Sequence, residues 1–232
     1  MRIGSLQRPE PLPASDQFVS GDLFMRFRLS LRLSAVLLLA SAAMPVVLQA
    51  QGGHSNSVAN NQSDHVTMAT DKQGKPLPSP RHLLEFTHDH NGAQAHISLS
   101  YGAPSVRGRR VFGGEIVPYG QWWRAGANEA TAFTTDHALR IGDLAVPAGS
   151  YTLDVLPAAA GWQLIVNKQT GQWGTEYDPS RDLGRVPMKL ATLPTPQETL
   201  SYSFDHVTGN TATLHLRWAT TDASVVLMFP GS

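Results

Sequence analysis

The sequence predicts an all-β protein, an antiparallel β-sandwich or barrel-like fold of about nine or ten strands. Three observations predict it. Apolar and polar residues alternate with a period of two in several segments, turn-forming residues separate these segments, and no helical stripe longer than a turn or two follows residue 79. With 232 residues, 41% of them hydrophobic, the chain is long enough to bury a core.

The alternation is clearest in four segments, each of which would turn one apolar face toward a core. They are residues 95–101, 151–155, 162–166 and 214–218. Ile165 is the one apolar residue that interrupts the third segment, and Val225, Leu227 and Phe229 predict a last strand. Turns are predicted where glycine, proline and asparagine gather, at Asn91-Gly92, 141–143, 147–149, 160–161 and 208–210.

One segment departs from the strand pattern. Between Gly102 and Asn128 the chain carries six glycines, together with Pro104 and Pro118. A connection of this length within a compact β domain usually has a function or packs over the fold. We therefore expect a long Gly-rich connection across one end of the domain.

The first fifty residues predict export. Residues 25–50 have the features of a signal peptide, with three arginines ahead of an apolar run and Leu48-Gln49-Ala50 in the place of a cleavage site. The run is too short to span a bilayer and contains Pro45. We therefore expect cleavage near Ala50, no membrane span in the mature protein, and a periplasmic or extracellular location.

The remaining segments complete the predicted organisation. Residues 1–24 do not fit a signal peptide, so we expect Met25 to be the initiator and residues 1–24 to be a non-native upstream extension. Residues 51–78 are polar and show no apolar period, which predicts a flexible linker. Residues 79–232 are then a single β-rich domain.

Composition argues against several classes of function. Lys+Arg and Asp+Glu both number 18, whereas a nucleic-acid partner normally requires a basic excess. The chain has no cysteine, which excludes disulfides, thiolate metal sites and cysteine nucleophiles. Phosphate-loop and dinucleotide fingerprints are absent, so we expect no cofactor. The oligomeric state is left open.

Several motifs resemble one known family, the domain of unknown function family numbered 2911. The most specific are Arg-Gly-Arg at 107–109, Trp-Arg-Ala-Gly-Ala-Asn-Glu-Ala-Thr at 123–131 and Gly-Gln-Trp-Gly at 171–174. Shorter ones are Ser79-Pro80-Arg81, Phe112-Gly113-Gly114 and 117–120. The resemblance covers about residues 79–230 and implies export and a β-rich fold, with no established activity. The chain departs from the family at Ala103, where a basic residue commonly precedes the proline.

The candidate site combines cations with aromatic residues on two Gly-rich connections. Arginine suits carboxylate, phosphate or sulfate groups, and Trp and Tyr offer flat faces to sugars. We expect a pocket between the 102–129 connection and the 168–177 loop that binds a small polar ligand, anionic or saccharide-like. Its candidate residues are Arg107, Arg109, Arg124, Asn128, Glu129, Lys168, Trp173 and Tyr177.

Other interpretations stay open beside this one. Glu129 can be a structural residue, paired with Arg124 or Arg109 inside a packed plug that serves structure or protein interaction. It is also the weak catalytic candidate of an extracytoplasmic carbohydrate hydrolase, with Asp178 as the second carboxylate. No Gly-x-Ser-x-Gly elbow supports a serine hydrolase. The residues favour a binding module over an enzyme.

A metal site has little support. His88 and His90 are two positions apart on a predicted strand and would share a face, with His82 and His96 nearby. Polar residues are expected in any case at a strand end before Asn91-Gly92. We therefore predict no metal and keep His88 and His90 as weak candidates.

Overall fold

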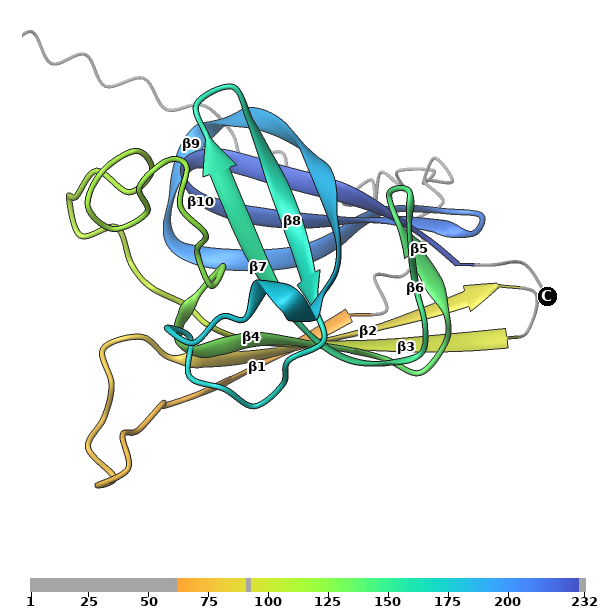
Figure 1. The fold of residues 1–232 in the computed structure, drawn as a ribbon, viewed down its shortest axis with the longest axis horizontal. Coiled ribbons are helices and arrows are strands. Elements are labelled where there is room, and N and C mark those ends of the chain that lie inside the picture. Colours follow the sequence, from red (N-terminus) through yellow and green to blue (C-terminus); the bar gives the residue numbers. More distant parts are fainter. Residues whose placement is uncertain (1–61, 91–92, 230–232) are drawn as a thin grey trace, which may run out of the picture. The chain divides into compact units, whose positions relative to one another are not determined.

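The computed structural model of the chain describes residues 62–90 and 93–229, and their fold is built from antiparallel strands (Figure 1). The strands are β1 (Gln62–Thr67), β2 (Arg81–His90), β3 (Ala93–Gly102), β4 (Ala127–Thr135), β5 (Leu139–Ile141), β6 (Leu144–Val146), β7 (Gly149–Ala158), β8 (Gly161–Asn167), β9 (Asp182–Thr208) and β10 (Thr211–Met228). A short 3-10 turn, η1 (Pro179–Arg181), precedes β9. The all-β prediction is confirmed.

All ten strands belong to one sheet, in the order β1-β2-β3-β4-β7-β8-β9-β10-β5-β6. Each neighbouring pair is antiparallel, and β1 and β6 stand at the two ends of an open sheet. Four of the predicted turns, at 141–143, 147–149, 160–161 and 208–210, join consecutive strands. The predicted turn at Asn91-Gly92 lies outside the described residues.

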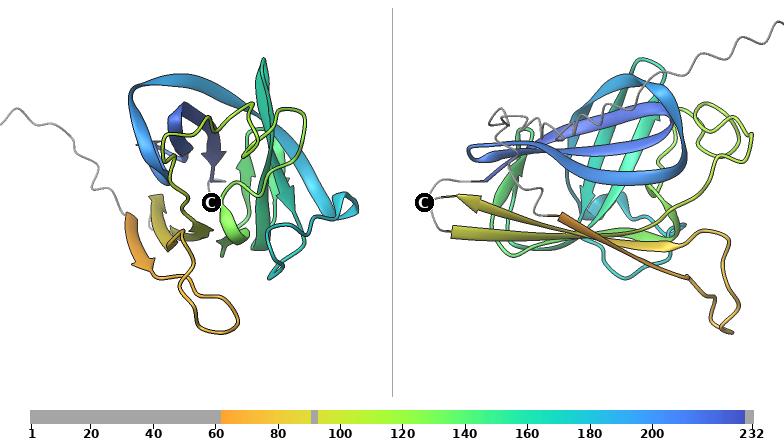
Figure 2. Two further views of the ribbon diagram at one scale, coloured as in Figure 1. Left: turned by 90° about the vertical axis from the view of Figure 1, so that its left-hand side faces the viewer. Right: turned by 180° about the vertical axis from the view of Figure 1, so that it is seen from behind.

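The two longest strands, β9 and β10, give the sheet its layered form. Residues 182–188 of β9 pair with β8, and residues 189–192 and 197–208 pair with β10. The sheet curls through β9, so that β9 and β10 lie over β2 and β3 (Figure 2). Ring contacts cross between the layers: Phe86 stacks on Phe204 at 4.4 Å, and Tyr101 meets Tyr202 edge-on at 4.8 Å.

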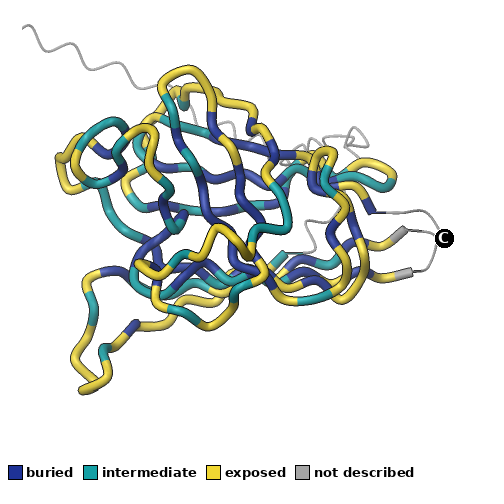
Figure 3. Tube along the Cα trace, viewed as in Figure 1, coloured by how far each residue is buried: buried dark blue, intermediate teal, exposed yellow. Residues whose placement is uncertain are grey.

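The core lies between these layers and contains the apolar residues of the predicted segments, whereas Thr152 and Asp154, on the polar face of β7, are buried as well. Figure 3 shows the buried residues mainly in the strands and the exposed ones mainly in the connections. Aromatic rings fill one end of the core, where Trp218 is stacked on Trp123 at 5.9 Å and Phe112 packs edge-on against Trp162 at 4.5 Å. Trp218 is completely buried. Because Phe112 and Trp123 come from the 102–129 connection, this connection is part of the core.

The structure differs from the expected linker over part of its length. Residues 62–67 form β1, which pairs with residues 81–86 of β2, and Thr70 forms a bridge with Pro76. Five of the six residues of β1 are exposed, so this edge strand depends on backbone hydrogen bonds and needs no apolar face. That is why the apolar pattern did not reveal it. The predicted upstream extension, the signal peptide and residues 51–61 lie outside the described residues.

The long connection packs across one end of the sheet, as expected. Main-chain hydrogen bonds fix it to two strands: Trp123 and Val155 of β7 exchange both bonds, at 2.7 and 2.8 Å, and Val106 N donates to Glu198 O of β9 at 2.8 Å. At the start of the connection, a Cβ on Gly102 would collide with the carbonyl oxygen of Ala127. Glycine is therefore needed where the connection leaves β3 beside β4.

Candidate functional site

A cleft of about 440 Å³ opens where the two Gly-rich connections meet. We call it the arginine cleft. The long connection supplies most of the wall, and the rest is formed by Pro78, Ser79, Gly174, Thr175 and Trp218. Its charged lining residues are three arginines and a single glutamate: Arg107, Arg109, Arg124 and Glu115. This places part of the predicted residue set in one hollow.

Arg124 is the least satisfied of these cations. Its Nη1 donates to the carbonyl oxygen of Gly174 at 3.4 Å, and its Nε is buried with no hydrogen-bond partner. Within the described ranges, no carboxylate lies at ion-pair distance from Arg124. Burial lowers the pKa of the Arg124 guanidinium, which still stays protonated at any physiological pH. A buried donor without an acceptor costs about 1–3 kcal/mol, which a ligand oxygen would offset.

Gly174 allows Arg124 to reach the cleft. A Cβ at Gly174 would overlap both the Arg124 side chain and the carbonyl oxygen of Asn128. The amide of Gly174 donates to that same Asn128 oxygen at 3.1 Å. Because Gly174, the last residue of the Gly-Gln-Trp-Gly motif, has no side chain, the Arg124 side chain fits between the loop and β4.

Arg107 and Arg109 form the rim of the cleft. Arg109 donates from Nε to Val106 O at 3.0 Å and from Nη2 to Ser105 O at 2.7 Å, so it braces the turn that carries it. Arg107 has a positive φ of 49°, and its Nη2 donates to Pro78 O at 3.3 Å. A non-glycine residue in this region stores strain of about 1–3 kcal/mol, which is common at binding sites. Neither arginine forms an ion pair in the part of the chain described here.

Aromatic side chains form the inner and lateral walls. Trp123 and Trp218 belong to the core and also line the cleft, while Trp122 is half-buried. Trp122 lies 4.8 Å from the ring of Tyr177 and lines a neighbouring hollow of about 610 Å³ as well. The two hollows therefore adjoin at Trp122.

Asn128 and Glu129 lie outside the arginine cleft and form contacts that hold β4 to neighbouring segments. Asn128 Nδ2 donates to Ser79 O at 3.1 Å, which ties β4 to the segment before β2. Glu129 Oε2 lies 3.3 Å from Arg81 Nη1 in an ion pair, and neither Asn128 nor Glu129 is a lining residue of the arginine cleft. The internal partner of Glu129 is thus Arg81, from the Ser-Pro-Arg motif, in place of the expected Arg124 or Arg109.

The three candidates from the 168–177 loop lie apart from the arginines. Lys168 and Trp173 are exposed and do not line the arginine cleft. Tyr177 lines the neighbouring hollow, where its hydroxyl donates to Asp182 at 2.9 Å and accepts from Arg185 at 3.0 Å. Burial and the adjacent Asp182 raise the pKa of Tyr177 to about 12, so the hydroxyl stays protonated.

Among the described residues, the lining of the arginine cleft contains no carboxylate pair for glycoside hydrolysis. Asp178 caps η1, accepting from Ser180 N at 2.9 Å, and does not line the arginine cleft. Glu129 is held by Arg81, which leaves Glu115 as the one carboxylate among the described lining residues. A retaining or inverting glycosidase needs two carboxyl groups facing the same sugar.

The histidine candidates also have a structural setting. His88 is 2% exposed, and its ring stacks on Phe229 at 4.1 Å. It is therefore part of the apolar core, while the side chain of His90 lies outside the described residues. No group of three or more His, Asp or Glu side chains in residues 62–90 and 93–229 is arranged to hold a metal ion.

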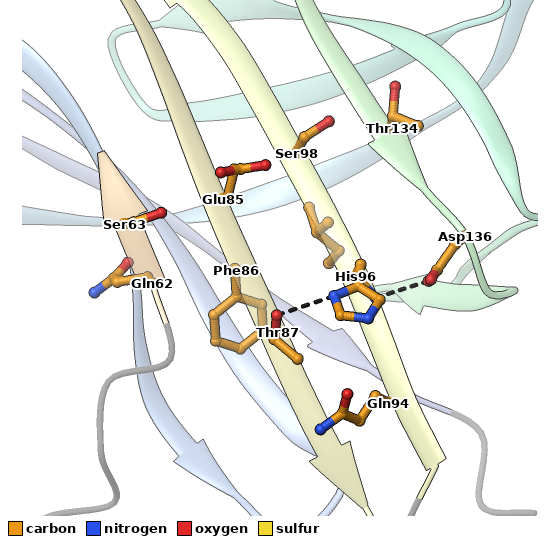
Figure 4. A pocket seen from close by; sticks show the side chains of 11 residues that line it. Gln62, Ser63, Glu85, Phe86, Thr87, Gln94, His96, Ser98, Thr134 and Asp136 are labelled. Atoms are coloured by element: carbon orange, nitrogen blue, oxygen red, sulfur yellow. Dashed lines mark hydrogen bonds between the residues drawn. The ribbon is translucent and has the colours of Figure 1, made fainter. Parts of the chain in front are cut away.

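A wider hollow, of about 790 Å³, lies on the outer face of β1 to β4 (Figure 4). Its polar groups pair locally: His96 Nδ1 lies 3.0 Å from Thr87 Oγ1, and Asp136 accepts from the His96 amide at 2.7 Å. Its described lining includes two carboxylates and no arginine or lysine. These groups are exposed to water or bonded to each other. This hollow is therefore a weaker candidate for a ligand site than the arginine cleft, where the Nε of Arg124 has no hydrogen-bond partner.

Sequence reasoning missed some important residues of the site. Glu115 and Trp218 were not singled out, although Glu115 lies inside the motif-rich connection. The sequence indicated Arg81 only as part of the Ser-Pro-Arg motif. It did not indicate the ion pair with Glu129, which is 48 positions away. Pairing between such distant positions leaves no local pattern in the sequence.

Comparison with known proteins gives one match. The family model described as "Protein of unknown function (DUF2911)" matches residues 79–227, and no curated protein or solved structure matches the chain. In the described residues, no helix has the length and apolar character needed to cross a membrane. The family match covers well over half of the chain and confirms the resemblance seen in its motifs. The chain belongs to the DUF2911 family.

Proposed function

We propose that this member of the DUF2911 family is an exported binding module whose arginine cleft holds a small anionic, saccharide-like ligand. A sugar acid such as a uronate is the simplest molecule that combines both properties. The cleft volume of about 440 Å³ lies within the range of small-molecule sites, roughly 300–1,000 Å³.

The observation that carries the proposal is the state of Arg124. A half-buried guanidinium with no carboxylate partner and a buried, unbonded Nε is unusual, because buried charges are normally paired. A carboxylate, sulfate or phosphate oxygen on a ligand would supply the missing acceptor. Arginine also presents its donors as a planar fork, which matches such groups.

The surroundings of Arg124 support the choice of an acidic sugar. Three arginines against one glutamate give the lining an excess of positive charge, which favours an anion. The indole of Trp122 offers a flat apolar face beside Arg124, on which the carbon face of a sugar ring can lie. A single lining carboxylate, Glu115, favours binding over glycoside hydrolysis.

The experiment is a calorimetric titration of the mature protein with glucuronate, and glucose is the uncharged control. We expect glucuronate to bind and glucose to bind far more weakly. Arg124→Met keeps the length and apolar stem of the side chain and removes its charged donors. Charged hydrogen bonds contribute about 1.5–3 kcal/mol, so we expect glucuronate affinity to fall about tenfold to 100-fold.

Arg140→Met is the matched control, because Arg140 is an exposed arginine on β5 that does not line the cleft. It should bind glucuronate as the wild type does. Equal affinity for glucuronate in all three proteins, or no binding by any of them, would contradict the proposal and favour the structural interpretation of the loop cluster.

Export is proposed from the sequence of residues 25–50. The test is fractionation of cells that express the full chain, followed by N-terminal sequencing of the protein that leaves the cytoplasm. We expect the mature chain to begin at Gln51. A chain retained in the cytoplasm with residues 25–50 intact would contradict export.

A further inference from the structure

A second polar site lies where β10 bends. The register between β9 and β10 shifts on either side of Ala219, which has a positive φ of 52°, and residues 193–196 of β9 have no partner there. His215 and Asp222 are seven positions apart, which is roughly 23 Å along a straight strand. The bend instead brings His215 Nδ1 to 2.8 Å from Asp222 Oδ1.

The contact with Asp222 determines which ring nitrogen of His215 carries the proton. Both Asp222 oxygens lie close to Nδ1, at 2.8 and 3.0 Å, and a carboxylate accepts, so the proton belongs on Nδ1. Arg217 holds the carboxylate in place by donating from Nε to Asp222 Oδ2 at 3.2 Å. Arg217 is held in turn by Asp205, at 2.7 Å.

In the neutral imidazole, this arrangement makes the other ring nitrogen, Nε2, an acceptor. His215 is 8% exposed, and its Nε2 is buried without a hydrogen-bond partner. The residue nevertheless lines a cleft of about 430 Å³, which we call the hairpin cleft. Buried polar atoms are normally hydrogen-bonded, so a molecule in this cleft that carries a donor would satisfy Nε2.

The rest of the hairpin cleft indicates the character of that donor. Most of its exposed lining is apolar and comes in part from Pro187, Ala191, Val225 and Val226, with the polar residues Lys189, Thr213, Asp222 and Ser224 between them. The ring of His206, an exposed residue, lies 5.9 Å from the ring of His215 and adds a flat face. A molecule that fits such walls is mainly apolar and carries one hydrogen-bond donor.

We propose that the hairpin cleft binds a small phenol or apolar alcohol, whose hydroxyl donates a hydrogen bond to Nε2 of His215. The His206 side chain, on the surface next to His215, turns aside to admit the hydroxyl. This site is separate from the arginine cleft and does not depend on the function proposed for it.

The test uses 4-methylphenol and its methyl ether, which share a ring but differ in the donor hydrogen. Each is titrated into the ¹⁵N-labelled mature protein while backbone amides and the His215 imidazole are followed by NMR. We expect 4-methylphenol to shift the Nε2 resonance and the amides of Thr213, Ser224 and Val226. One neutral hydrogen bond predicts that the ether binds roughly threefold to tenfold more weakly.

Two variants separate the hydrogen bond from general apolar binding. His215→Phe keeps a ring but removes the acceptor, so the two compounds should then bind equally. His96→Phe, on the outer face of β3, should preserve the wild-type difference. If His215→Phe does not fold, the comparison of the two compounds on the wild type still shows whether the donor hydrogen contributes to binding. Equal binding to the wild type, shifts confined to the arginine cleft, or no shift up to the solubility limit of 4-methylphenol would overturn the proposal.

Discussion

Asp154 gives a prediction whose size follows from its burial. This carboxyl lies on β7 and is 2% exposed. Burial, with a smaller contribution from Asp182, raises its pKa from the ordinary value of 3.8 to about 7. Asp154→Asn replaces the carboxyl by a neutral group of nearly the same shape, so it removes the titration while keeping the packing.

The sign follows from the protons bound in each state. Between pH 3.8 and about 7 the folded protein keeps the Asp154 proton and the unfolded chain does not, so stability falls as pH rises through this interval. Each pH unit is worth about 1.4 kcal/mol, which gives up to about 4 kcal/mol over the whole interval. This is an upper limit, because the protein relaxes around a buried charge and admits water.

The assay is urea unfolding of the wild type and Asp154→Asn in parallel across this range. We expect nearly equal stability at about pH 4 and a growing advantage for the variant up to about pH 8. Other titrating groups contribute equally to both proteins and cancel in the difference. A difference in unfolding free energy that does not change with pH would refute the placement of Asp154 in a water-poor interior.

Three further substitutions test the architecture around the arginine cleft. Gly174→Ala should destabilise the protein by about 1–3 kcal/mol in urea unfolding, since its Cβ would overlap Arg124. Gly161→Ala is the control and should be nearly neutral, because the space around Gly161 is open. Equal effects of the two substitutions would contradict the close packing of Arg124 against Gly174. Glu129→Gln should change stability by less than about 1 kcal/mol and leave glucuronate affinity unchanged, because its ion pair with Arg81 is partly exposed. A loss of affinity would return Glu129 to the site. Tyr202→Phe should cost about 1–2 kcal/mol in thermal or urea unfolding, since the buried hydroxyl donates to Ala125 O at 2.8 Å; an unchanged stability would show that this bond contributes nothing.

The sequence predicted β3, β7 and β8 from alternation, because a strand with one apolar face has a period of two. β3 has one buried and one mainly exposed face, whereas the polar Thr152 and Asp154 of β7 and Asn167 of β8 are buried as well. β1 has no buried face, so its sequence shows no apolar period and predicts linker. The bend in β10 was hidden as well: the apolar residues up to Trp218 and from Val225 onward read as separate segments, yet they belong to one strand.

The candidate site was only partly predictable, for a similar reason. Arg107, Arg109 and Arg124 share one connection, so expecting them together required only that this connection pack across the sheet. Whether each arginine has an internal partner depends on residues far away in the chain. Glu129 is paired with Arg81, and in the part of the chain that the structure describes no carboxylate forms an ion pair with Arg124. Lys168 was a candidate because of its charge, and it lines neither the arginine cleft nor the neighbouring hollow.

The proposed function depends most directly on the Nε–H group of Arg124. Its ¹H–¹⁵N resonance can be observed by NMR and assigned by its loss in Arg124→Met. We predict that glucuronate shifts this resonance and slows exchange of its proton with water, because the ligand supplies the missing acceptor, while glucose does neither. An Nε–H resonance that stays unchanged at saturating glucuronate would contradict the account, whatever happens at Arg107 and Arg109.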